Sequence, residues 1–271
     1  MKLLIIGAKG KMGKNHVRVS KKLLRTAVHT LKTCDIEGDT DYSDYKKAIK
    51  EFIPTHVIIA TPTPTHGEIL DYCIKMNVFS VLVEKPIIDG YDAMKYMDVK
   101  TTRIMVGHIE RYNTVVDIMK NLISGKEIDT IICTRSGLLS EEEDYNLHLD
   151  LCIHDSDVCQ LLTNHLLYKA PRMLAKNSQA NSCNLFTEIN GVDCFLHADK
   201  KSPHKRREIK VMGPGYIIEA DYMNQRLWHN GLEIHIGKSE PLLAELDIFF
   251  KSKFTKEDLK EAIFNLKIVR A

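Results

Sequence analysis

An aspartate and a histidine four positions apart, Asp150 and His154, are the residues of this chain best suited to moving a proton. In a helix, residues i and i+4 lie on one face, so the two side chains would be neighbours. A carboxylate beside an imidazole orients the ring and stabilises its protonated form, as general acid/base catalysis requires. Asp157 continues the same face. Two other interpretations stay open: an ordinary ion pair on a helix, and a metal site that includes His148, which is disfavoured because His148 falls on another face.

A lysine at the end of an apolar run is the second candidate for proton chemistry. Lys85 belongs to the tripeptide Glu84-Lys85-Pro86, which follows the run Val78–Val83. At the mouth of a parallel sheet, an ammonium group beside a carboxylate can donate or accept a proton at a substrate oxygen. A lysine at a strand end is also commonly just a solvated charge, so a catalytic role depends on what binds next to it.

A glycine-rich stretch after the first apolar run indicates where an anion binds. The run Leu3–Ile6 leads into Gly7-Ala8-Lys9-Gly10-Lys11-Met12-Gly13. A buried strand, a tight glycine turn and a helix with unpaired N–H groups at its N-terminus together hold a dinucleotide pyrophosphate. The spacing is one residue longer in the first gap than the usual dinucleotide pattern. A glycine turn that only redirects the chain is the alternative.

Two further segments lie where a dinucleotide-binding sheet would use them. Asp35 follows an expected strand, 22 residues after Gly13, where a carboxylate binds the adenosine ribose hydroxyls. It would favour NAD because a carboxylate repels the 2′-phosphate of NADP, although an aspartate that starts an ordinary turn is an equally good interpretation. The segment Ala60-Thr61-Pro62-Thr63-Pro64-Thr65-His66 follows another expected strand, and Thr65 is a candidate N-cap for the next helix.

Strand and helix patterns alternate over the first ~110 residues, which predicts a parallel sheet with crossover helices. The expected strands are apolar almost throughout, as in a sheet covered on both faces. They are Lys2–Ile6, Val28–Cys34, His56–Ala60, Val78–Val83 and Arg103–Val106. The helices expected between them are Met12–Leu24, Asp44–Phe52, Thr65–Met76 and Tyr91–Met97.

Beyond this region the pattern changes to helices and then consecutive strands with turn signals between them, which predicts an α+β domain. The expected helices are Val115–Ile123, Leu147–Leu162, Glu240–Ser252 and Glu257–Arg270. The expected strands are Thr130–Ser136, Asn184–Ile189, Asp193–Ala198, Glu208–Met212 and Tyr216–Ala220. We therefore predict an α/β protein with a dinucleotide-binding domain over residues 1–112 and a second domain over residues 113–271.

Composition argues against several classes of protein. The 38 basic and 36 acidic residues give a net charge of +2, which leaves no electrostatic footprint for a nucleic acid or a membrane surface. One basic cluster, from Lys200 to Arg207, is a solvated loop or a contact for a phosphate-bearing substrate. Seven cysteines without a C-x-x-C pair indicate reduced thiols, with neither a disulfide framework nor a metal site. The first strand leaves no room for a signal peptide and no apolar run approaches the ~20 residues of a membrane span, so we expect a cytoplasmic protein.

Taken in order along nearly the whole chain, these motifs resemble those of the Gfo/Idh/MocA family, which includes glucose–fructose oxidoreductases and inositol dehydrogenases. The motifs that carry the resemblance are the glycine loop with His16, Ala60-Thr61-Pro62 with His66, Glu84-Lys85-Pro86, Gly107-His108-Ile109-Glu110-Arg111-Tyr112-Asn113, Asp150 to His154, and Glu240-Pro241-Leu242. The chain departs from the family in its glycine spacing, in its shorter length, and in Thr114, where many members have proline.

The resemblance implies a Rossmann domain followed by an α+β domain whose open, mostly antiparallel sheet often forms the interface of a homo-oligomer. It implies hydride transfer between a nicotinamide, NAD with NADP left open, and a sugar carbinol carbon. Lys85 would contact the reacting oxygen and the cofactor, His154 would be the general acid/base, and Asp150 would hold His154. The residues that would line the substrate site are Arg111, Tyr112 and Asn113. The expected cofactor-binding residues are Gly7, Gly10, Lys11, Met12, Gly13, Asp35, Thr61, Pro62, His66, Glu84 and Lys85.

Several segments are similar to the nucleotide-sugar branch of the family, which would make C3 of a UDP-N-acetyl-hexosamine the carbon oxidised. Two rival functions remain. One is reduction of a non-sugar imine or enone, as in dihydrodipicolinate and biliverdin reductases, the first of which has a similar glycine spacing. The other is a non-catalytic NAD-binding regulator. The pair Asp150 and His154 fits a carbinol substrate better, and a pure binder has no need for these residues and Lys85 together.

Overall fold

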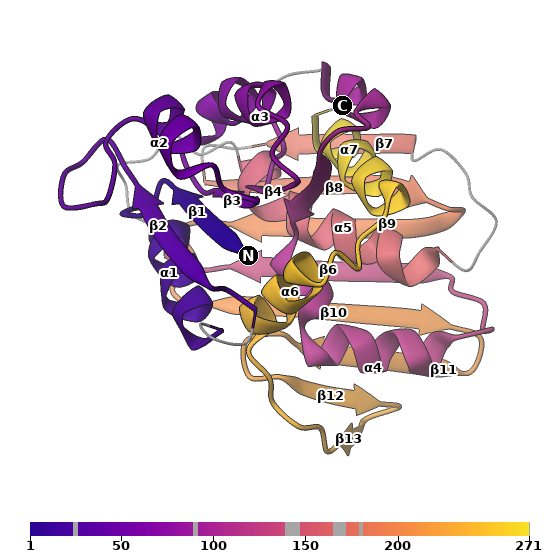
Figure 1. The fold of residues 1–271 in the computed structure, drawn as a ribbon. Coiled ribbons are helices and arrows are strands. Elements are labelled where there is room, and N and C mark those ends of the chain that lie inside the picture. The colour runs from indigo at the N-terminus through magenta and orange to yellow at the C-terminus, as the bar shows by residue number, and fades with distance from the viewer. Residues whose placement is uncertain (24–26, 89–91, 139–146, 165–171, 179–180, 271) are drawn as a thin grey trace. The chain divides into compact units, whose positions relative to one another are not determined.

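Five short parallel strands form the first sheet of the protein (Figure 1). They are β1 (Lys2–Ile6), β2 (Thr30–Cys34), β3 (His56–Ile59), β4 (Ser80–Glu84) and β5 (Arg103–Gly107), in the order β2-β1-β3-β4-β5. β3 and β4 are buried along their whole length and β1 along nearly all of it, as helices on both faces of a sheet require. In this computed structural model, residues 1–23, 27–88, 92–138, 147–164, 172–178 and 181–270 are described.

The helices between these strands lie on both sides of the sheet. α1 (Lys11–Lys22) connects β1 to β2. It lies on one face of the sheet, and α2 (Tyr45–Phe52) and α3 (His66–Lys75) lie on the other (Figure 1). Right-handed crossovers require this arrangement, because β2 and β3 pair with opposite edges of β1. The strand order therefore reverses between β1 and β3. Sheets of this kind bind ligands at such a point, outside the carboxyl ends of the strands.

The chain divides into two compact units. The first comprises Met1–His108 with Leu242–Ile263, and the second comprises Ile109–Pro241 with Phe264–Ala271. The first unit thus includes most of α6 (Pro241–Phe250) and the first half of α7 (Lys256–Arg270). Its C-terminal segment packs on the sheet through aromatic rings: Phe249 lies 5.4 Å from the ring of His56, at the start of β3.

An eight-stranded sheet forms the second unit, in the order β13-β12-β11-β10-β6-β9-β8-β7. Only β6 and β9 pair in parallel; every other neighbouring pair among these eight strands is antiparallel. The strands are β6 (Thr130–Ser136), β7 (Arg172–Ser178), β8 (Ser182–Ile189), β9 (Val192–Asp199), β10 (Arg206–Gly213), β11 (Tyr216–Asp221), β12 (Arg226–His229) and β13 (Leu232–Ile234).

Helices cover one face of this sheet. α4 (Thr114–Ile123) lies over β11, and α5 (Ile153–Thr163) lies over β8 and β9 (Figure 1). Inward residues of β6 such as Ile131 and Cys133 are fully buried, whereas Ile132 between them is 39% exposed. This alternation is typical of a sheet with one covered face. On the outward face, the rings of Phe186 and Phe195 stack at 4.2 Å.

The predicted fold class is confirmed: an α/β protein with a parallel Rossmann-type sheet and a second, mostly antiparallel sheet. Three strands were not expected, β7, β12 and β13, and the last two have only four and three residues. The expected helix Tyr91–Met97 is a 3-10 helix, Asp92–Asp98, with Tyr91 outside the described residues. The expected helix Leu147–Leu162 begins as a π-helical turn, His148–Cys152, before α5.

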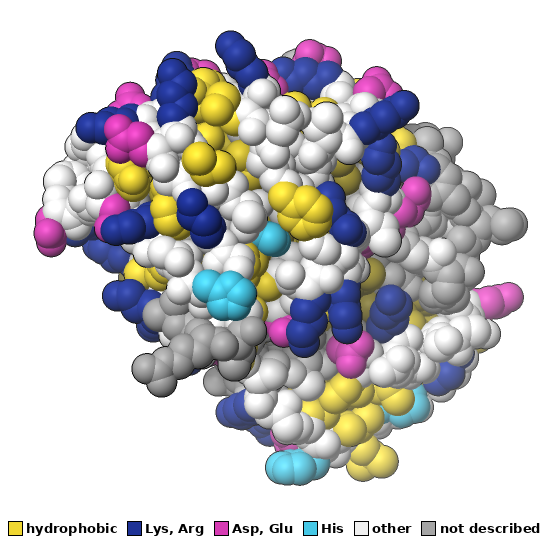
Figure 2. All heavy atoms as spheres, in the orientation of Figure 1, with side chains coloured by type: hydrophobic (Ala, Val, Ile, Leu, Met, Phe, Trp, Pro, Cys, Tyr) yellow, Lys and Arg dark blue, Asp and Glu magenta, His cyan; other side chains and the backbone are white. Residues whose placement is uncertain are grey.

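Charge is distributed in keeping with the near-balanced composition. On the face drawn in Figure 2, Lys and Arg side chains are scattered among acidic and uncharged ones. All seven cysteines are buried free thiols.

Candidate cofactor and catalytic site

The glycine loop between β1 and α1 is held in a conformation that side chains would block. Gly7 has a φ of +82°, and a Cβ on it would lie 2.5 Å from the carbonyl oxygen of Ala60. A Cβ on Gly13 would lie 1.9 Å from the carbonyl oxygen of Gly7. Gly10 has room for a Cβ, whose nearest neighbour would be 3.4 Å away. Two of the three loop glycines are therefore required. Gly7 allows the loop to pass close to the backbone of Ala60, and Gly13 allows the start of α1 to pass close to the backbone of Gly7.

The N-terminus of α1 is open to an anion. Gly10 occupies the N-cap position and has no side chain to bond the first N–H groups, and the first turn has no acidic residue. Lys11, Met12 and Gly13 form this first turn, so their N–H groups and the positive end of the helix dipole are available to a phosphate.

A pocket of about 410 Å³ opens beside this loop, where the strand order reverses. Its wall comes from the carboxyl ends of β1, β2 and β3 and from α3. Ile36 on its rim is 90% exposed, an apolar surface that no described residue covers. The lining includes Gly7, Lys9, Gly10, Asp35, Ile36, Glu37, Thr61, Pro62 and Glu68. Among the described residues that line the pocket, Lys9 is the only cation, against the three carboxylates of Asp35, Glu37 and Glu68.

Asp35 is fixed in this pocket by backbone groups. Its Oδ2 accepts a hydrogen bond of 2.7 Å from the N–H of Lys9, and its Oδ1 accepts one of 3.2 Å from the N–H of Glu37. The carboxylate is therefore held at the end of β2. This placement fits both sequence interpretations, a ribose-binding aspartate and an aspartate that starts a turn, because the bond to Glu37 closes such a turn.

His66 joins the two loops that carry Thr61 and Lys85. Its Nε2 lies 2.8 Å from the carbonyl oxygen of Thr61, and its Nδ1 lies 2.8 Å from that of Pro86. The ring is 1% exposed, so the contacts described for His66 are with the loops and not with the pocket. Thr65 stands at the N-cap position of α3 as expected but does not cap it, because its hydroxyl lies 2.8 Å from the carbonyl oxygen of Pro62 instead.

Glu84 points into the first unit. Its Oε1 lies 2.7 Å from Nε2 of His16, and both residues are buried. A Cβ on Gly107 would lie 3.2 Å from this carboxylate, so β5 packs closely against it. The expected cofactor-binding residue Glu84 thus fixes α1 to the end of β4, beside Lys85. The contact with Glu84 also explains why a histidine is buried at position 16, a role that the spacing of motifs in the sequence does not show.

The expected catalytic pair lies in the second unit. Asp150 belongs to the π-helical turn His148–Cys152, and His154 is the second residue of α5. Both side chains are half-buried. π-helical turns are rare and occur frequently at functional sites.

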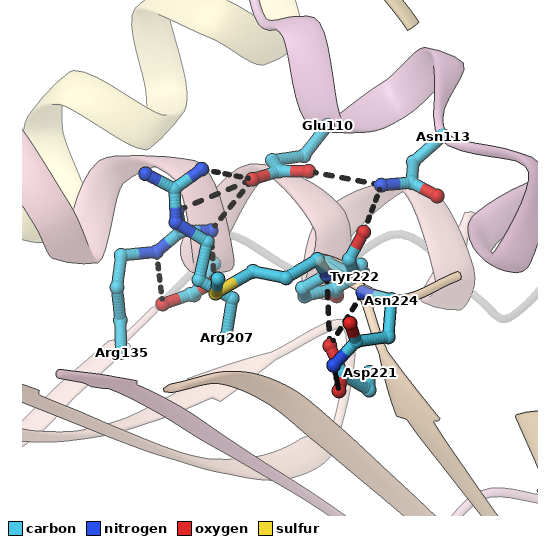
Figure 3. Close-up of polar contacts among 9 residues, drawn as sticks. Glu110, Asn113, Arg135, Arg207, Asp221, Tyr222 and Asn224 are labelled. Atoms are coloured by element: carbon cyan, nitrogen blue, oxygen red, sulfur yellow. Dashed lines mark hydrogen bonds and ion pairs between the residues drawn. The ribbon is translucent and has the colours of Figure 1, made fainter. Parts of the chain in front are cut away.

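Two of the three expected substrate residues make structural contacts in the second unit. Arg111 binds the carboxylate of Asp157 with two bonds of 2.6 and 2.7 Å. Asn113 is 2% exposed; its side chain caps α4 and donates a bond of 3.1 Å to the carbonyl oxygen of Tyr222 (Figure 3). Tyr112 is half-buried at the end of the 3-10 helix Ile109–Tyr112.

A buried charge cluster in the second unit was not predicted. Glu110 accepts bonds of 3.2 and 3.3 Å from Arg135 and lies 3.5 Å from Arg207 (Figure 3). Arg135 also binds Asp155 at 2.9 and 3.2 Å. Burial alone lowers the pKa of Arg135, but Asp155 and Glu110 together raise it, so the guanidinium stays charged. In the sequence, Arg135 follows Ile131 and Cys133 at the period of two that marks one face of a strand, so alternation places it on the buried face, but no local pattern identifies its partners Glu110 and Asp155.

Residues 1–108 match the Gfo/Idh/MocA family, described as an oxidoreductase family with an NAD-binding Rossmann fold. The first unit carries the Rossmann domain of this family. The glycine loop, the open N-terminus of α1 and the pocket beside it all lie within the residues that match this NAD-binding domain.

Several of the known proteins that are similar to this chain are named as dehydrogenases of sugars. UDP-N-acetylglucosamine 3-dehydrogenase from Acidithiobacillus ferrooxidans is 22% identical over 217 residues, which span 72% of this chain and 69% of that protein. A crystal structure with that name from the same organism has a TM-score of 0.83 at 19% identity, covering 100% of this chain and 97% of the other. A levoglucosan dehydrogenase in complex with NADH and levoglucosan has a TM-score of 0.79 at 17% identity, covering 100% and 96%. At these identities the structural likeness establishes the fold.

The described residues contain neither a membrane-spanning helix nor a cluster of metal ligands. None of their helices has the length and apolar character needed to cross a membrane. No three His, Cys, Asp or Glu side chains among them are grouped to hold a metal ion.

Proposed function

We propose that this protein is an NAD-dependent dehydrogenase that oxidises a carbinol carbon of a sugar, with C3 of a UDP-N-acetyl-hexosamine as the specific expectation. The observation that carries the cofactor part is the glycine cradle at Gly7 and Gly13, next to a pocket with an oriented Asp35. The sugar part is supported by the names of the similar dehydrogenases and by the residues Asp150 and His154.

The residues of the first unit fit the cofactor. The open first turn of α1 would bind the pyrophosphate, and the Asp35 carboxylate would accept hydrogen bonds from the ribose hydroxyls. Glu37 and Glu68 line the same pocket, so the 2′-phosphate of NADP would meet three carboxylates and one lysine, Lys9. This charge balance favours NAD. Bound nicotinamide supplies the carbon that takes the hydride from the substrate.

The proposed proton chemistry uses residues of both units. His154 takes the proton of the substrate hydroxyl, and Asp150 stabilises the protonated ring. Lys85 donates a hydrogen bond to the same oxygen, which lowers the cost of the charge that develops there. Their joint action is part of the proposal, since Lys85 belongs to one unit and the Asp150–His154 segment to the other.

We also propose that the outward face of the eight-stranded sheet contacts a second copy of the chain. Ile132, Phe195 and Ile217 on this face are 39–42% exposed, and an apolar surface of this kind is typical of an interface.

The function is tested by adding NAD and UDP-N-acetylglucosamine to the purified protein and recording the absorbance of reduced nicotinamide. His154→Asn and Lys85→Met are each expected to lower kcat by about a hundredfold or more while the Kd of NAD changes little. His235→Asn and Lys75→Met, which replace exposed residues of the same types, serve as matched controls. Turnover that survives both catalytic substitutions would refute the assigned roles, and turnover of an imine or enone in place of every sugar would favour the reductase alternative.

A further inference from the structure

Two consecutive residues of the 3-10 helix Ile109–Tyr112 hold the start of α5 through charged pairs. Glu110 binds Arg135 (Figure 3). Arg135 in turn binds Asp155 with two bonds of 2.9 and 3.2 Å. Arg111 holds Asp157 with two bonds of 2.6 and 2.7 Å. Each arginine presents a planar fork to both carboxylate oxygens, which fixes direction as well as distance.

These groups are buried, so their geometry is strongly determined. Glu110 is 5% exposed, Arg135 3%, Asp155 2% and Asp157 1%. Losing one partner would leave a buried charge uncompensated, which is far more costly than the net gain from forming the pair. A third contact comes from Asn265, whose Nδ2 donates a bond of 2.7 Å to Asp157.

The position of the pairs on α5 points to their purpose. Asp155 directly follows His154, and Asp157 lies one turn beyond it on the same helix face. α5 begins after a π-helical turn, and the side chain of its N-cap residue, Cys152, makes no capping bond. The first turn of α5 is therefore fixed by charged pairs to neighbouring elements rather than by a cap.

We propose that Glu110, Arg111 and Arg135 are positioning residues that set the orientation of the His154 ring. This inference rests on the proposed acid/base role of His154. It also gives Arg111 a function different from the substrate contact that the family resemblance implies, because both bonds described for its guanidinium go to Asp157 and the side chain is 8% exposed.

Arg111→Lys and Arg135→Lys test the proposal because each variant keeps the positive charge but cannot form the two parallel hydrogen bonds of the arginine to its carboxylate. With NAD and UDP-N-acetylglucosamine, each variant is expected to lower kcat about tenfold, with the sugar KM changed less than about threefold and the Kd of NAD unchanged. Arg226→Lys is the matched control, since Arg226 holds Glu233 by two similar bonds of 2.7 and 2.8 Å on an exposed part of the same unit.

A readout that needs no substrate separates this inference from the proposed function. In NMR spectra of protein with ¹³C-labelled histidine rings, His154→Asn identifies the His154 signal. Arg111→Lys and Arg135→Lys are expected to shift that signal and its titration midpoint, whereas Arg226→Lys leaves both unchanged. If no sugar is turned over, the proposed function fails while the spectra still decide whether these residues position the ring.

Two results would overturn the inference. One is a loss of thermal stability in the lysine variants with an unaltered His154 signal, which would make the pairs merely structural. The other is a raised sugar KM with an unaltered signal, which would make Arg111 a substrate contact. Glu110→Gln and Asp157→Asn, which keep size and shape, provide the same comparison if the lysine variants do not fold.

Discussion

The backbone N–H of Lys9 donates a hydrogen bond of 2.7 Å to Oδ2 of Asp35. This bond connects the glycine loop after β1 to the end of β2, 26 residues further along the chain. It holds the carboxylate at the pocket while leaving lone pairs free to accept further hydrogen bonds. This one hydrogen bond therefore fixes the position of the loop that would bind the pyrophosphate relative to the carboxylate that would bind the ribose.

Replacing Asp35 with serine should change the choice of cofactor. The substitution removes the charge-assisted bonds to the ribose hydroxyls, so the KM of NAD should rise about tenfold or more, while the repulsion of the 2′-phosphate of NADP decreases. Steady-state kinetics with both cofactors measure the ratio of kcat/KM values. Asp39→Asn is the control, because Asp39 is an exposed carboxylate whose Oδ2 lies 3.7 Å from Nζ of Lys9. An unchanged ratio in Asp35→Ser would remove Asp35 from the cofactor site.

Alanine at Gly13 and at Gly10 should have different consequences. A Cβ on Gly13 would meet the carbonyl oxygen of Gly7 at 1.9 Å, so Gly13→Ala should destabilise the unliganded protein by about 2 kcal/mol. Gly10→Ala meets nothing closer than 3.4 Å and should leave that stability unchanged, while its methyl group projects beside the pocket and weakens NAD binding. Denaturant unfolding without cofactor and calorimetric titration with NAD separate the two effects. Equal destabilisation by both substitutions would contradict the close approach at Gly13.

Stability of the protein should fall as the pH is lowered from about 6.5 to about 4, because of His56. Burial, followed by the charge of the N-terminal amino group, lowers the pKa of His56 from 6.5 to about 4. The ring packs against Phe79 and Phe249, and its Nε2 has no hydrogen-bond partner among the described residues. Between the two pKa values the unfolded chain binds a proton that the folded protein excludes. The stabilisation present above pH 6.5 is therefore lost as the pH falls, by roughly 3 kcal/mol at most.

Denaturant unfolding across this pH range, with wild type and His56→Leu compared, measures the effect. The leucine variant should lose this part of the pH dependence, and His235→Asn, at an exposed position, should retain it. Parallel curves for wild type and His56→Leu would show that His56 titrates normally in the folded state.

A charge on the outward face of the eight-stranded sheet should disrupt a homo-oligomer. Phe195 is 42% exposed there and stacks on Phe186. Phe195→Lys would bury an unpaired ammonium group in any contact between two copies of this face, which costs far more than an exposed lysine does. Light scattering coupled to size-exclusion chromatography should report a smaller mass for the variant than for wild type. A monomeric wild type, or an unchanged oligomer in the variant, contradicts the proposed interface.

Local sequence patterns were sufficient for the elements around the cofactor site. The apolar run Leu3–Ile6, the glycines after it and the following helix are specified by short-range rules, and the structure confirms this strand, turn and helix in that order. The same holds for α2, which begins after Asp44, whose side chain accepts a bond of 2.6 Å from the N–H of Lys47. The order of the motifs along the chain was also sufficient to predict the family to which residues 1–108 match.

The partners of the polar side chains were decided by tertiary structure. His16 and Glu84 are 68 residues apart, and Arg111 and Asp157 are 46 apart. No local pattern pairs them, because each contact depends on strand order and on how the elements pack. Thr65 illustrates the same limit at short range: the 3-10 turn before α3 turns its hydroxyl toward Pro62, so the expected cap does not form.

By itself, then, the sequence determined which residue types are available and which short segments become strands, turns and helices, because propensity, glycine conformation and hydrophobic period act over a few residues. Arg135 shows what only the tertiary structure decided. It became a buried cation because β6 lies in the middle of its sheet, between β10 and β9, and because its side of the strand faces the helices. Alternation along β6 puts Arg135 on the face of Ile131 and Cys133, but only the assembled structure brings that face to the carboxylates of Glu110 and Asp155, which come from other segments of the chain.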